Sequence, residues 1–459
     1  MKNKKILFGF FAITIALISG CNKQATSDVE IFLPIESTIN ISTEAPTDTT
    51  TTPSDEATNV ITNSTEDIRS EENTGESSSK TEQSTEDIPV IAPVEPANVS
   101  LIAVGDMLLH GGIHTSSQQS DGSYDYTHVF EHVIDRIAAA DIAVANQEVI
   151  LGGAELGISS YPNFNAPYDF GNYLVKTGFD VILHASNHTM DKDTIGVLNT
   201  MSFWKQNHPD ITVLGINENQ EERDMVKIVE KNGIKIAMLN YTYGLNGYEL
   251  PEGKPYLINL MNESTKEDIK KDLQKARETS DFVIVYPHWG TEYVLEETSE
   301  QQQWAQFYAD NGADLIIGTH PHVVEPVKWI TAADGRQVLV YYSLGNFISI
   351  QYYNYSMLGG MAKIDIRKDE KGTYIADYGM DFLVTHYTGG RTEMTTYFLE
   401  DYTEDLAGRH AIHVEPYTAA DGKYAEGYRN INQWYPFTVD GLNSLAKQIC
   451  PDLYQKNTD

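Results

Sequence analysis

Residues 99–106 read VSLIAVGD, an apolar run that ends in Gly105 and Asp106. A run of this length that is rich in Val, Ile and Leu is typical of a buried strand. The polar pair then stands where the strand would end. The stretch therefore predicts a buried strand with a carboxylate at its carboxyl end.

Similar runs recur along the chain and alternate with helical stretches. Further strands are predicted at residues 142–145, 181–184, 211–214, 234–240, 282–286, 315–317 and 338–342, and helices at 128–140, 193–206, 266–279 and 300–311. This alternation favours a layered α/β fold. Beyond residue 350 the sequence predicts strands at 360–366 and 374–385 and a closing helix at 439–449. With no internal repeat, we expect one domain over residues 98–459.

The first residues form an export signal. A basic start at Lys2, Lys4 and Lys5 precedes an apolar run over residues 6–18, and Cys21 follows small residues. The run is short for a permanent bilayer span, and the residues before Cys21 resemble a bacterial lipobox. We expect a lipoprotein signal peptide at 1–21, lipid on Cys21, and a protein anchored at the extracytoplasmic face of the bacterial membrane. An uncleaved anchor is the alternative.

The next segment, residues 22–97, is rich in Ser, Thr, Glu, Asp and Pro. It carries 16 acidic and 3 basic side chains, and its apolar runs are short. Such a composition does not bury a core, and its like charges repel one another. We expect a disordered linker that holds the domain away from the lipid anchor.

The charge of the chain limits its partners. The 459 residues carry a formal charge of −34, and residues 98–459 keep −24 because the first 21 residues carry +3 and residues 22–97 carry −13. A surface of this sign repels nucleic-acid phosphates, so we expect no nucleic-acid partner. With only 2 cysteines, the chain also has no disulfide framework.

Polar residues follow the predicted strands in five successive places. In chain order these groups are Asp106 with His110, Asn146 with Glu148, Asn187 and His188 with Asp191, His288 with Glu292, and His320 with His322. The carboxyl ends of strands are where loops converge on a ligand in an α/β sheet. We therefore expect these side chains to meet, although scattered capping and core-polar residues are the alternative.

The donor types in these groups point to metal chemistry. Carboxylates, an amide oxygen and imidazoles without any thiolate suit Mn, Fe or Zn, and a shared carboxylate can bridge two such ions. A two-ion centre activates water and stabilises both oxygens of a displacement. We expect an extended His320-x-His322 segment, stiffened by Pro321, with both rings on one side.

Taken together, the motifs resemble those of the CapA family of capsule-synthesis proteins, also called poly-γ-glutamate synthesis proteins. The matching motifs are Gly105-Asp106, Asn146-x-Glu148, Ser186-Asn187-His188-x-x-Asp191, His288-Trp289-Gly290-x-Glu292-Tyr293, Gly318-x-His320-Pro321-His322 and Tyr342-Ser343-Leu344-Gly345-Asn346-Phe347. They lie in the family's order over residues 98–350. That family is similar in turn to calcineurin-like metallophosphoesterases, which implies a four-layered α/β/β/α sandwich.

The resemblance also implies roles for individual residues. It places Asp106 and His322 on one divalent ion, Asn187, His288 and His320 on a second, and Glu148 between the two. It makes His188 the catalytic residue that steadies substrate charge or protonates the leaving group. Asp191 and Glu292 are left as further ligands or as residues that orient histidines and substrate amines, and His110 is left as a further ligand or a residue behind the ligands.

Three functions fit this reading. The first is a lipid-anchored hydrolase or transferase that acts on an anionic capsule polymer or its precursor, by cleaving an amide or a phosphoester. The second is a non-catalytic component of a capsule-synthesis complex. It is favoured by departures from the phosphoesterase pattern at His110, Glu148 and Thr189. The third is a phosphate-scavenging phosphoesterase. For the stretch 342–355, a buried strand and turn is favoured over a sugar-binding groove.

Overall fold

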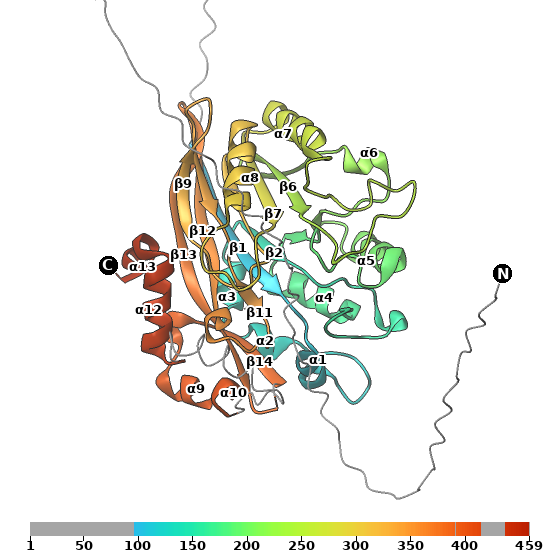
Figure 1. Ribbon diagram of the computed structural model, residues 1–459, viewed down its shortest axis with the longest axis vertical. Coiled ribbons are helices and arrows are strands. Elements are labelled where there is room, and N and C mark those ends of the chain that lie inside the picture. The colour runs from blue at the N-terminus through green and yellow to red at the C-terminus, as the bar shows by residue number, and fades with distance from the viewer. Residues whose placement is uncertain (1–95, 391, 415–436, 459) are drawn as a thin grey trace, which may run out of the picture. The chain divides into compact units, whose positions relative to one another are not determined.

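The computed structural model describes residues 96–390, 392–414 and 437–458 (Figure 1). All of these lie in one of the two units of the chain, residues 91–459. The expected signal peptide and residues 22–95 of the expected linker lie outside the described residues. Within the described residues, no helix is both long enough and apolar enough to span a bilayer.

The first sheet combines a parallel half with an antiparallel half. Its order is β14-β13-β12-β1-β2-β3-β4, and β11 pairs with the end of β1. The strands are β1 (Ala97–Met107), β2 (Ile142–Asn146), β3 (Val181–Leu183), β4 (Thr212–Leu214), β11 (Asn346–Ile348), β12 (Leu358–Asp369), β13 (Gly372–Thr388) and β14 (Thr392–Phe398). Strand β1 is parallel to β2 and antiparallel to β12, so it is central to the sheet.

The second sheet has the order β5-β6-β7-β8-β10-β9. Its strands are β5 (Lys227–Lys231), β6 (Ile234–Thr242), β7 (Phe282–His288), β8 (Leu315–Ile317), β9 (Val327–Thr331) and β10 (Gln337–Tyr341). The four inner strands are parallel, and an antiparallel strand closes each edge. In both sheets, therefore, the carboxyl ends of the parallel strands lie along one edge.

The helices and short turns connect these strands. The helices are α1 (Gly111–Ser117), α2 (Thr127–Phe130), α3 (Ile134–Ala138), α4 (Tyr168–Thr177), α5 (Asp193–Asn207), α6 (Gln220–Arg223), α7 (Lys266–Thr279), α8 (Ser299–Asp310), α9 (Glu404–Arg409), α10 (Ala411–Val414), α12 (Val439–Ile449) and α13 (Pro451–Thr458). Single 3₁₀ turns are η1 (Ala154–Leu156), η2 (Asn354–Met357) and η3 (Leu399–Asp401).

Side-chain alternation along β7 separates the layers of the domain. Ile284 and Tyr286 join the large core that the two sheets share, whereas Val283 and Val285 pack in a second core with α7 and α8. Successive residues of a strand point to opposite faces, so the second sheet lies between helices and the first sheet. Ile137 of α3 and Phe170 and Leu174 of α4 pack in the same large core as strands of the first sheet, and right-handed crossovers between parallel strands put such helices on one face of a sheet. The expected α/β/β/α layering is thereby confirmed.

Most of the predicted strands and helices are present, with one helix divided. The stretch 128–140, expected to be one helix, forms α2 and α3 with a break between them. At the break, the ring of His132 stacks on Tyr397 of β14 with the ring centroids 4.2 Å apart. The break therefore coincides with a contact to a strand that is distant in the sequence.

A close approach between two glycines fixes the end of β1. The Asp106 amide donates a hydrogen bond to the Gly345 carbonyl over 2.8 Å, and Asp106 is in register with Asn346 of β11. A Cβ on Gly105 would lie 1.9 Å from that carbonyl oxygen. The sequence motifs around residues 105 and 345 therefore contact each other directly through their backbones. Strand β11 is buried, which confirms the buried strand expected within residues 342–355.

We predict that Gly105→Ala lowers the free energy of unfolding by about 3 kcal/mol, because the added methyl group overlaps backbone atoms that cannot move aside. Denaturant unfolding of the purified protein measures this loss. Gly408→Ala is the matched control, since a Cβ there meets no atom within 4 Å. Equal stabilities of the two variants would contradict the close approach.

Candidate metal centre

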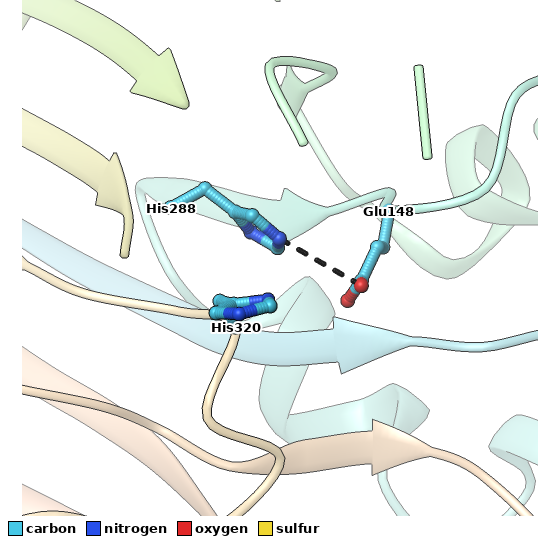
Figure 2. Close-up of side chains that lie close together, drawn as sticks. All are labelled: Glu148, His288 and His320. Atoms are coloured by element: carbon cyan, nitrogen blue, oxygen red, sulfur yellow. Dashed lines mark ion pairs between the residues drawn. The ribbon is translucent and has the colours of Figure 1, made fainter. Parts of the chain in front are cut away.

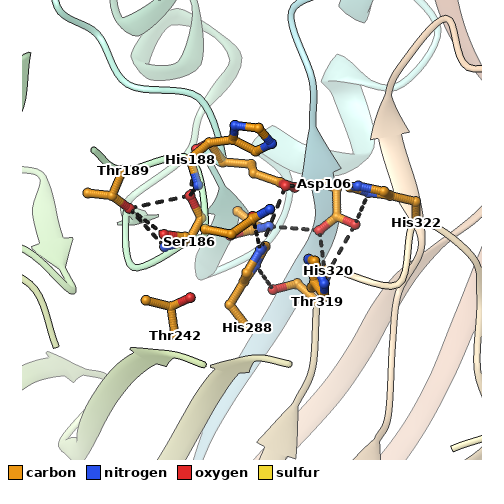
Figure 3. A network of polar contacts seen from close by, with 12 residues as sticks. Asp106, Ser186, His188, Thr189, Thr242, His288, Thr319, His320 and His322 are labelled. Carbon is orange, nitrogen blue, oxygen red and sulfur yellow. Dashed lines mark hydrogen bonds and ion pairs between the residues drawn. The ribbon is translucent and has the colours of Figure 1, made fainter. Parts of the chain in front are cut away.

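The polar groups predicted at the strand ends come together where the two sheets meet (Figure 3). Asp106 ends β1 and Glu148 follows β2 in the first sheet, while His288 ends β7 in the second. His320 and His322 follow β8. All five side chains are buried, with exposed fractions of 3% or less. The prediction that these residues meet is confirmed.

The Asp106 carboxylate connects three of these segments. Its Oδ1 accepts a hydrogen bond from Asn146 Nδ2 over 2.8 Å, and its Oδ2 accepts one from His322 Nδ1 over 2.9 Å. The main-chain amide of His320 donates to the same carboxylate at 3.1 Å. One side chain of β1 therefore holds the end of β2 and the turn after β8 in place.

The turn that carries His320 and His322 is not extended. His320 has φ of 103° and His322 has φ of 59°, both in the left-handed region that non-glycine residues rarely occupy. The expected extended segment is therefore wrong, although the two rings do lie near each other, 5.8 Å apart. The hydrogen bonds to Asp106 account for the strained backbone, and such strain is typical of functional sites.

Glu148 is the side chain whose surroundings are most unusual. Its exposed fraction is 1%, and neither carboxylate oxygen has a hydrogen-bond partner among the described residues. His288 Nε2 lies 3.7 Å from its Oε1 (Figure 2). His322 Nε2 lies 4.0 Å from the same oxygen. Burial, and next the charge of Asp106, raise the pKa of Glu148 well above its usual value. A buried carboxylate without hydrogen bonds is costly unless a cation compensates it.

The surrounding histidines supply nitrogen donors. His288 Nδ1 lies 3.0 Å from Thr319 Oγ1, and its Nε2 lies 2.9 Å from Asn187 Oδ1. Burial lowers the pKa of His288 well below its usual value, and burial also lowers that of His320 to about 3. These rings are therefore neutral, which is the form that binds metals. His320 Nδ1 is buried without a hydrogen-bond partner among the described residues.

His322 differs from the other two histidines. Burial lowers its pKa, but the charge of Glu148 and the hydrogen bond to Asp106 outweigh that effect and raise the pKa to about 9. The same hydrogen bond directs Nε2 away from Asp106 and toward Glu148. A carboxylate behind one nitrogen of an imidazole commonly orients the other nitrogen toward a metal.

Within the described residues, three groups of side chains have ligand atoms close enough to share an ion. They are Glu148 with His288 and His320, Asp106 with Glu148 and His322, and Glu292 with His320 and His322, and the atoms of each group lie within 4.8 Å of one another. The first two groups share Glu148. Oxygen and imidazole donors at these separations fit divalent metal binding, and an ion would compensate the Glu148 carboxylate.

His188 and Asp191 form a pair beside these groups. His188 Nδ1 lies 2.7 Å from Asp191 Oδ2, and that oxygen also accepts the Phe164 amide hydrogen at 2.7 Å. Asp191 therefore orients His188 and belongs to none of the three groups. His110 is outside them as well, with its Nδ1 3.0 Å from the Leu108 carbonyl oxygen.

Sequence reasoning missed one residue that contacts two members of the site. Asn246 follows β6 with φ of 50°, and its Oδ1 accepts a hydrogen bond from Asn187 Nδ2 over 3.1 Å. Its Nδ2 lies 3.3 Å from His188 Nδ1. The pair Asn246-Gly247 signals a turn, but a turn signal gives no indication of what the side chain contacts.

Thr189 has a structural role. Its Oγ1 donates to the His184 carbonyl oxygen over 2.6 Å and accepts the Ser186 amide hydrogen over 3.0 Å. These bonds hold the turn from which Asn187 and His188 project. The departure from the phosphoesterase pattern at Thr189 therefore leaves the turn intact.

Comparison with known proteins agrees with the motif order. Residues 100–351 match the family described as bacterial capsule synthesis protein PGA_cap. The chain belongs to this family. It is 26% identical over 300 residues to the capsule biosynthesis protein CapA of Bacillus anthracis. The aligned region covers 64% of this chain and 70% of that protein. It is 27% identical over 197 residues to the PGA biosynthesis protein CapA of Bacillus subtilis strain 168, covering 43% of this chain and about half, 49%, of that relative.

Solved structures with a similar arrangement are described as phosphoesterases. A phosphatase from Mycoplasma pneumoniae aligns with a TM-score of 0.38 and 15% identity, over 62% of this chain and 94% of that one. The calcineurin-like phosphoesterase YfkN from Bacillus subtilis aligns with a TM-score of 0.36 and 15% identity. This alignment covers 77% of this chain and 100% of that one. The expectation of a CapA-family protein is confirmed by the family match and the relatives.

A further buried carboxyl group, Glu325, lies behind the turn that carries His322. Gln301 Nε2 donates to its Oε2 over 2.6 Å, and its Oε1 has no hydrogen-bond partner among the described residues. Burial raises the pKa of Glu325 to about 9, although the Gln301 hydrogen bond opposes the shift. Glu325 is therefore protonated in the folded protein at neutral pH.

We predict that Glu325→Gln weakens the pH dependence of stability. Because the pKa is raised on folding, the folded state holds a proton that the unfolded state releases, and stability falls as pH rises from about 5 toward 9. We compare the slopes of the free energy of unfolding against pH between roughly pH 6 and 8. The wild-type slope should be more negative than that of the variant by about 1.4 kcal/mol per pH unit. Denaturant titrations at several pH values, in the presence of a chelator, measure the pH slope of stability for both proteins. Equal slopes for wild type and variant would contradict the assignment of Glu325 as protonated.

Proposed function

We propose that the protein is a metal-dependent hydrolase or transferase that acts on a capsule polymer or its precursor, with poly-γ-glutamate as the candidate. The observation that carries this proposal is Glu148, a buried carboxylate without hydrogen bonds that faces three histidines. A structural role would leave Glu148 buried without a hydrogen-bond partner for either oxygen, whereas divalent ions would bind those oxygens and compensate the carboxylate charge. The names of the relatives supply the capsule context.

The proposed centre holds two ions of Mn, Fe or Zn. Asp106 and His322 would hold one ion, Asn187, His288 and His320 the other, with Glu148 shared. The overlap of two ligand groups at Glu148 supports this division, and the 2.9 Å contact of Asn187 Oδ1 with His288 Nε2 supports the second set. Ions at these positions would polarise a substrate carbonyl or phosphoryl oxygen and activate water.

His188 is the proposed proton donor. Since a carboxylate only accepts hydrogen bonds, the contact with Asp191 places a hydrogen on Nδ1 and leaves Nε2 to exchange a proton with the leaving group. The Asp191 side chain is buried, and its Oδ2 fixes the ring through this bond. Asn246 supports Asn187 from a neighbouring loop, because its Oδ1 accepts the Asn187 Nδ2 hydrogen.

We predict about two equivalents of metal per chain in full-length protein purified without chelator. Glu148→Ala and His320→Ala should lose most of it, because each removes a donor from the shared groups. Elemental analysis is the measurement. His188→Asn is the matched control in the same site: its metal content should match wild type, while turnover of a γ-glutamyl amide or phosphoester falls on the order of 100-fold.

Two outcomes would count against the proposal. Metal-free wild type, even after reconstitution, would favour the second candidate, a non-catalytic component of a capsule-synthesis complex. Unchanged metal content in His320→Ala would exclude the ligand assignment. Loss of metal in His188→Asn would show that this residue belongs to the ligand set.

We further propose that the protein is anchored by lipid on Cys21 at the extracytoplasmic face of the membrane. The residues that support this are the basic start, the apolar run and the small residues before Cys21. The linker, with a charge of −13 over residues 22–97, would then extend the domain toward the polymer.

We predict that Cys21→Ala abolishes incorporation of labelled fatty acid and leaves the uncleaved precursor. Cys450→Ala, at the other cysteine of the chain, should keep the label, because Cys450 is buried near the C-terminus. Labelling of growing cells followed by gel analysis measures both. Label retained in Cys21→Ala would contradict the anchor.

A further inference from the structure

Glu292 lies at the entrance of the candidate metal centre. It follows β7 in the motif that begins at His288, and it is exposed. A carboxylate oxygen of Glu292 lies within 4.8 Å of ligand nitrogens of His320 and His322. Among the described residues, Glu292 makes no hydrogen bond and no salt bridge, and it acts on His322 only through its charge.

Two tyrosine rings lie beside the histidines near this carboxylate. The Tyr243 ring is 41% exposed, and its centroid lies 4.7 Å from that of His320. The Tyr293 ring lies 5.9 Å from His322. Burial, and next the negative charge of Glu292, raise the pKa values of Tyr161, Tyr243 and Tyr293. Tyr243 and Tyr293 therefore flank the two histidines whose ligand nitrogens lie near the Glu292 carboxylate.

The charged groups beside this entrance are acidic, apart from His322, whose pKa Glu292 helps to raise. Besides tyrosines, the groups that influence Tyr161, Tyr243 and Tyr293 are Glu292 and Glu148, without any Lys or Arg among them. A carboxylate beside aromatic faces attracts cations and repels phosphate. The buried His320 Nδ1, which has no hydrogen-bond partner in the described chain, marks the inner end of the same group.

We propose that Glu292 binds the ammonium group of the substrate. The proposal rests on the proposed function, and it narrows the substrate class to acyl compounds that carry a free primary amine near the reacting carbonyl. The ions would take the reacting oxygen while Glu292 and the rings of Tyr243 and Tyr293 hold the amine. A simple phosphate ester offers nothing to this carboxylate.

This assignment restricts where a polymer would be attacked. In a γ-linked glutamate chain, each internal α-nitrogen is part of an amide and carries no charge. Only the residue at the amino end has a free ammonium group. Recognition through Glu292 therefore directs the reaction to chain ends or to short precursors.

The test is calorimetric titration of the full-length protein with glutamate and with N-acetylglutamate, each as the L and the D compound, in Mn²⁺ buffer and in chelator. Wild type should bind at least one enantiomer of glutamate about tenfold more tightly than its N-acetyl derivative, since a hydrogen bond to a charged group is lost on acetylation. Glu292→Gln should abolish that preference with its metal content unchanged. Glu292→Asp should retain part of it.

Glu296→Gln is the matched control, because Glu296 is an exposed carboxylate of the same loop. It should keep the full preference for glutamate. No preference in wild type, or an undiminished preference in Glu292→Gln, would overturn the proposal, and so would loss of metal in Glu292→Gln, which would make Glu292 a ligand. Wild type without metal but with a Glu292-dependent preference would instead contradict only the proposed metal function and support the ammonium site.

Discussion

The Asp106 carboxylate is the contact on which the site depends. It belongs to the central strand of the first sheet, yet it accepts hydrogen bonds from His320 and His322, which follow a strand of the second sheet. Side chains from two sheets can share a ligand only if the sheets are held in register at that edge. The close approach of Gly105 and Gly345 supplies that alignment, because it fixes the end of β1 where the carboxylate projects.

The sequence predicts most of the fold and the composition of the site. Buried parallel strands have to be apolar almost throughout, so β1, β2, β7 and β8 are visible as runs, and the polar residues after them are visible as interruptions. The features that escape prediction depend on contacts distant in sequence. The left-handed turn at His320 and His322 follows from hydrogen bonds to Asp106, the break between α2 and α3 accompanies a stack on Tyr397, and Asn246 reaches the site from another loop.

Charge is distributed differently inside the site and around it. The domain carries −24, and the entrance to the site is acidic as well. Inside the site, Glu148 and the neutral histidines offer ligand atoms to which a cation would bind. An acidic protein can therefore concentrate positive charge at one point while the remaining surface keeps polyanions at a distance. Selection of a chain end over a chain interior is compatible with that arrangement.

The turn after β8 has a consequence for how the site can change over generations. His320 and His322 are separated by one residue, and both have backbone angles that few side chains tolerate. An insertion or deletion of one codon there displaces both imidazoles together and also breaks the amide contact with Asp106. The two imidazoles of this turn therefore depend on one short backbone segment, and a change of its length removes both of them from the centre in one event.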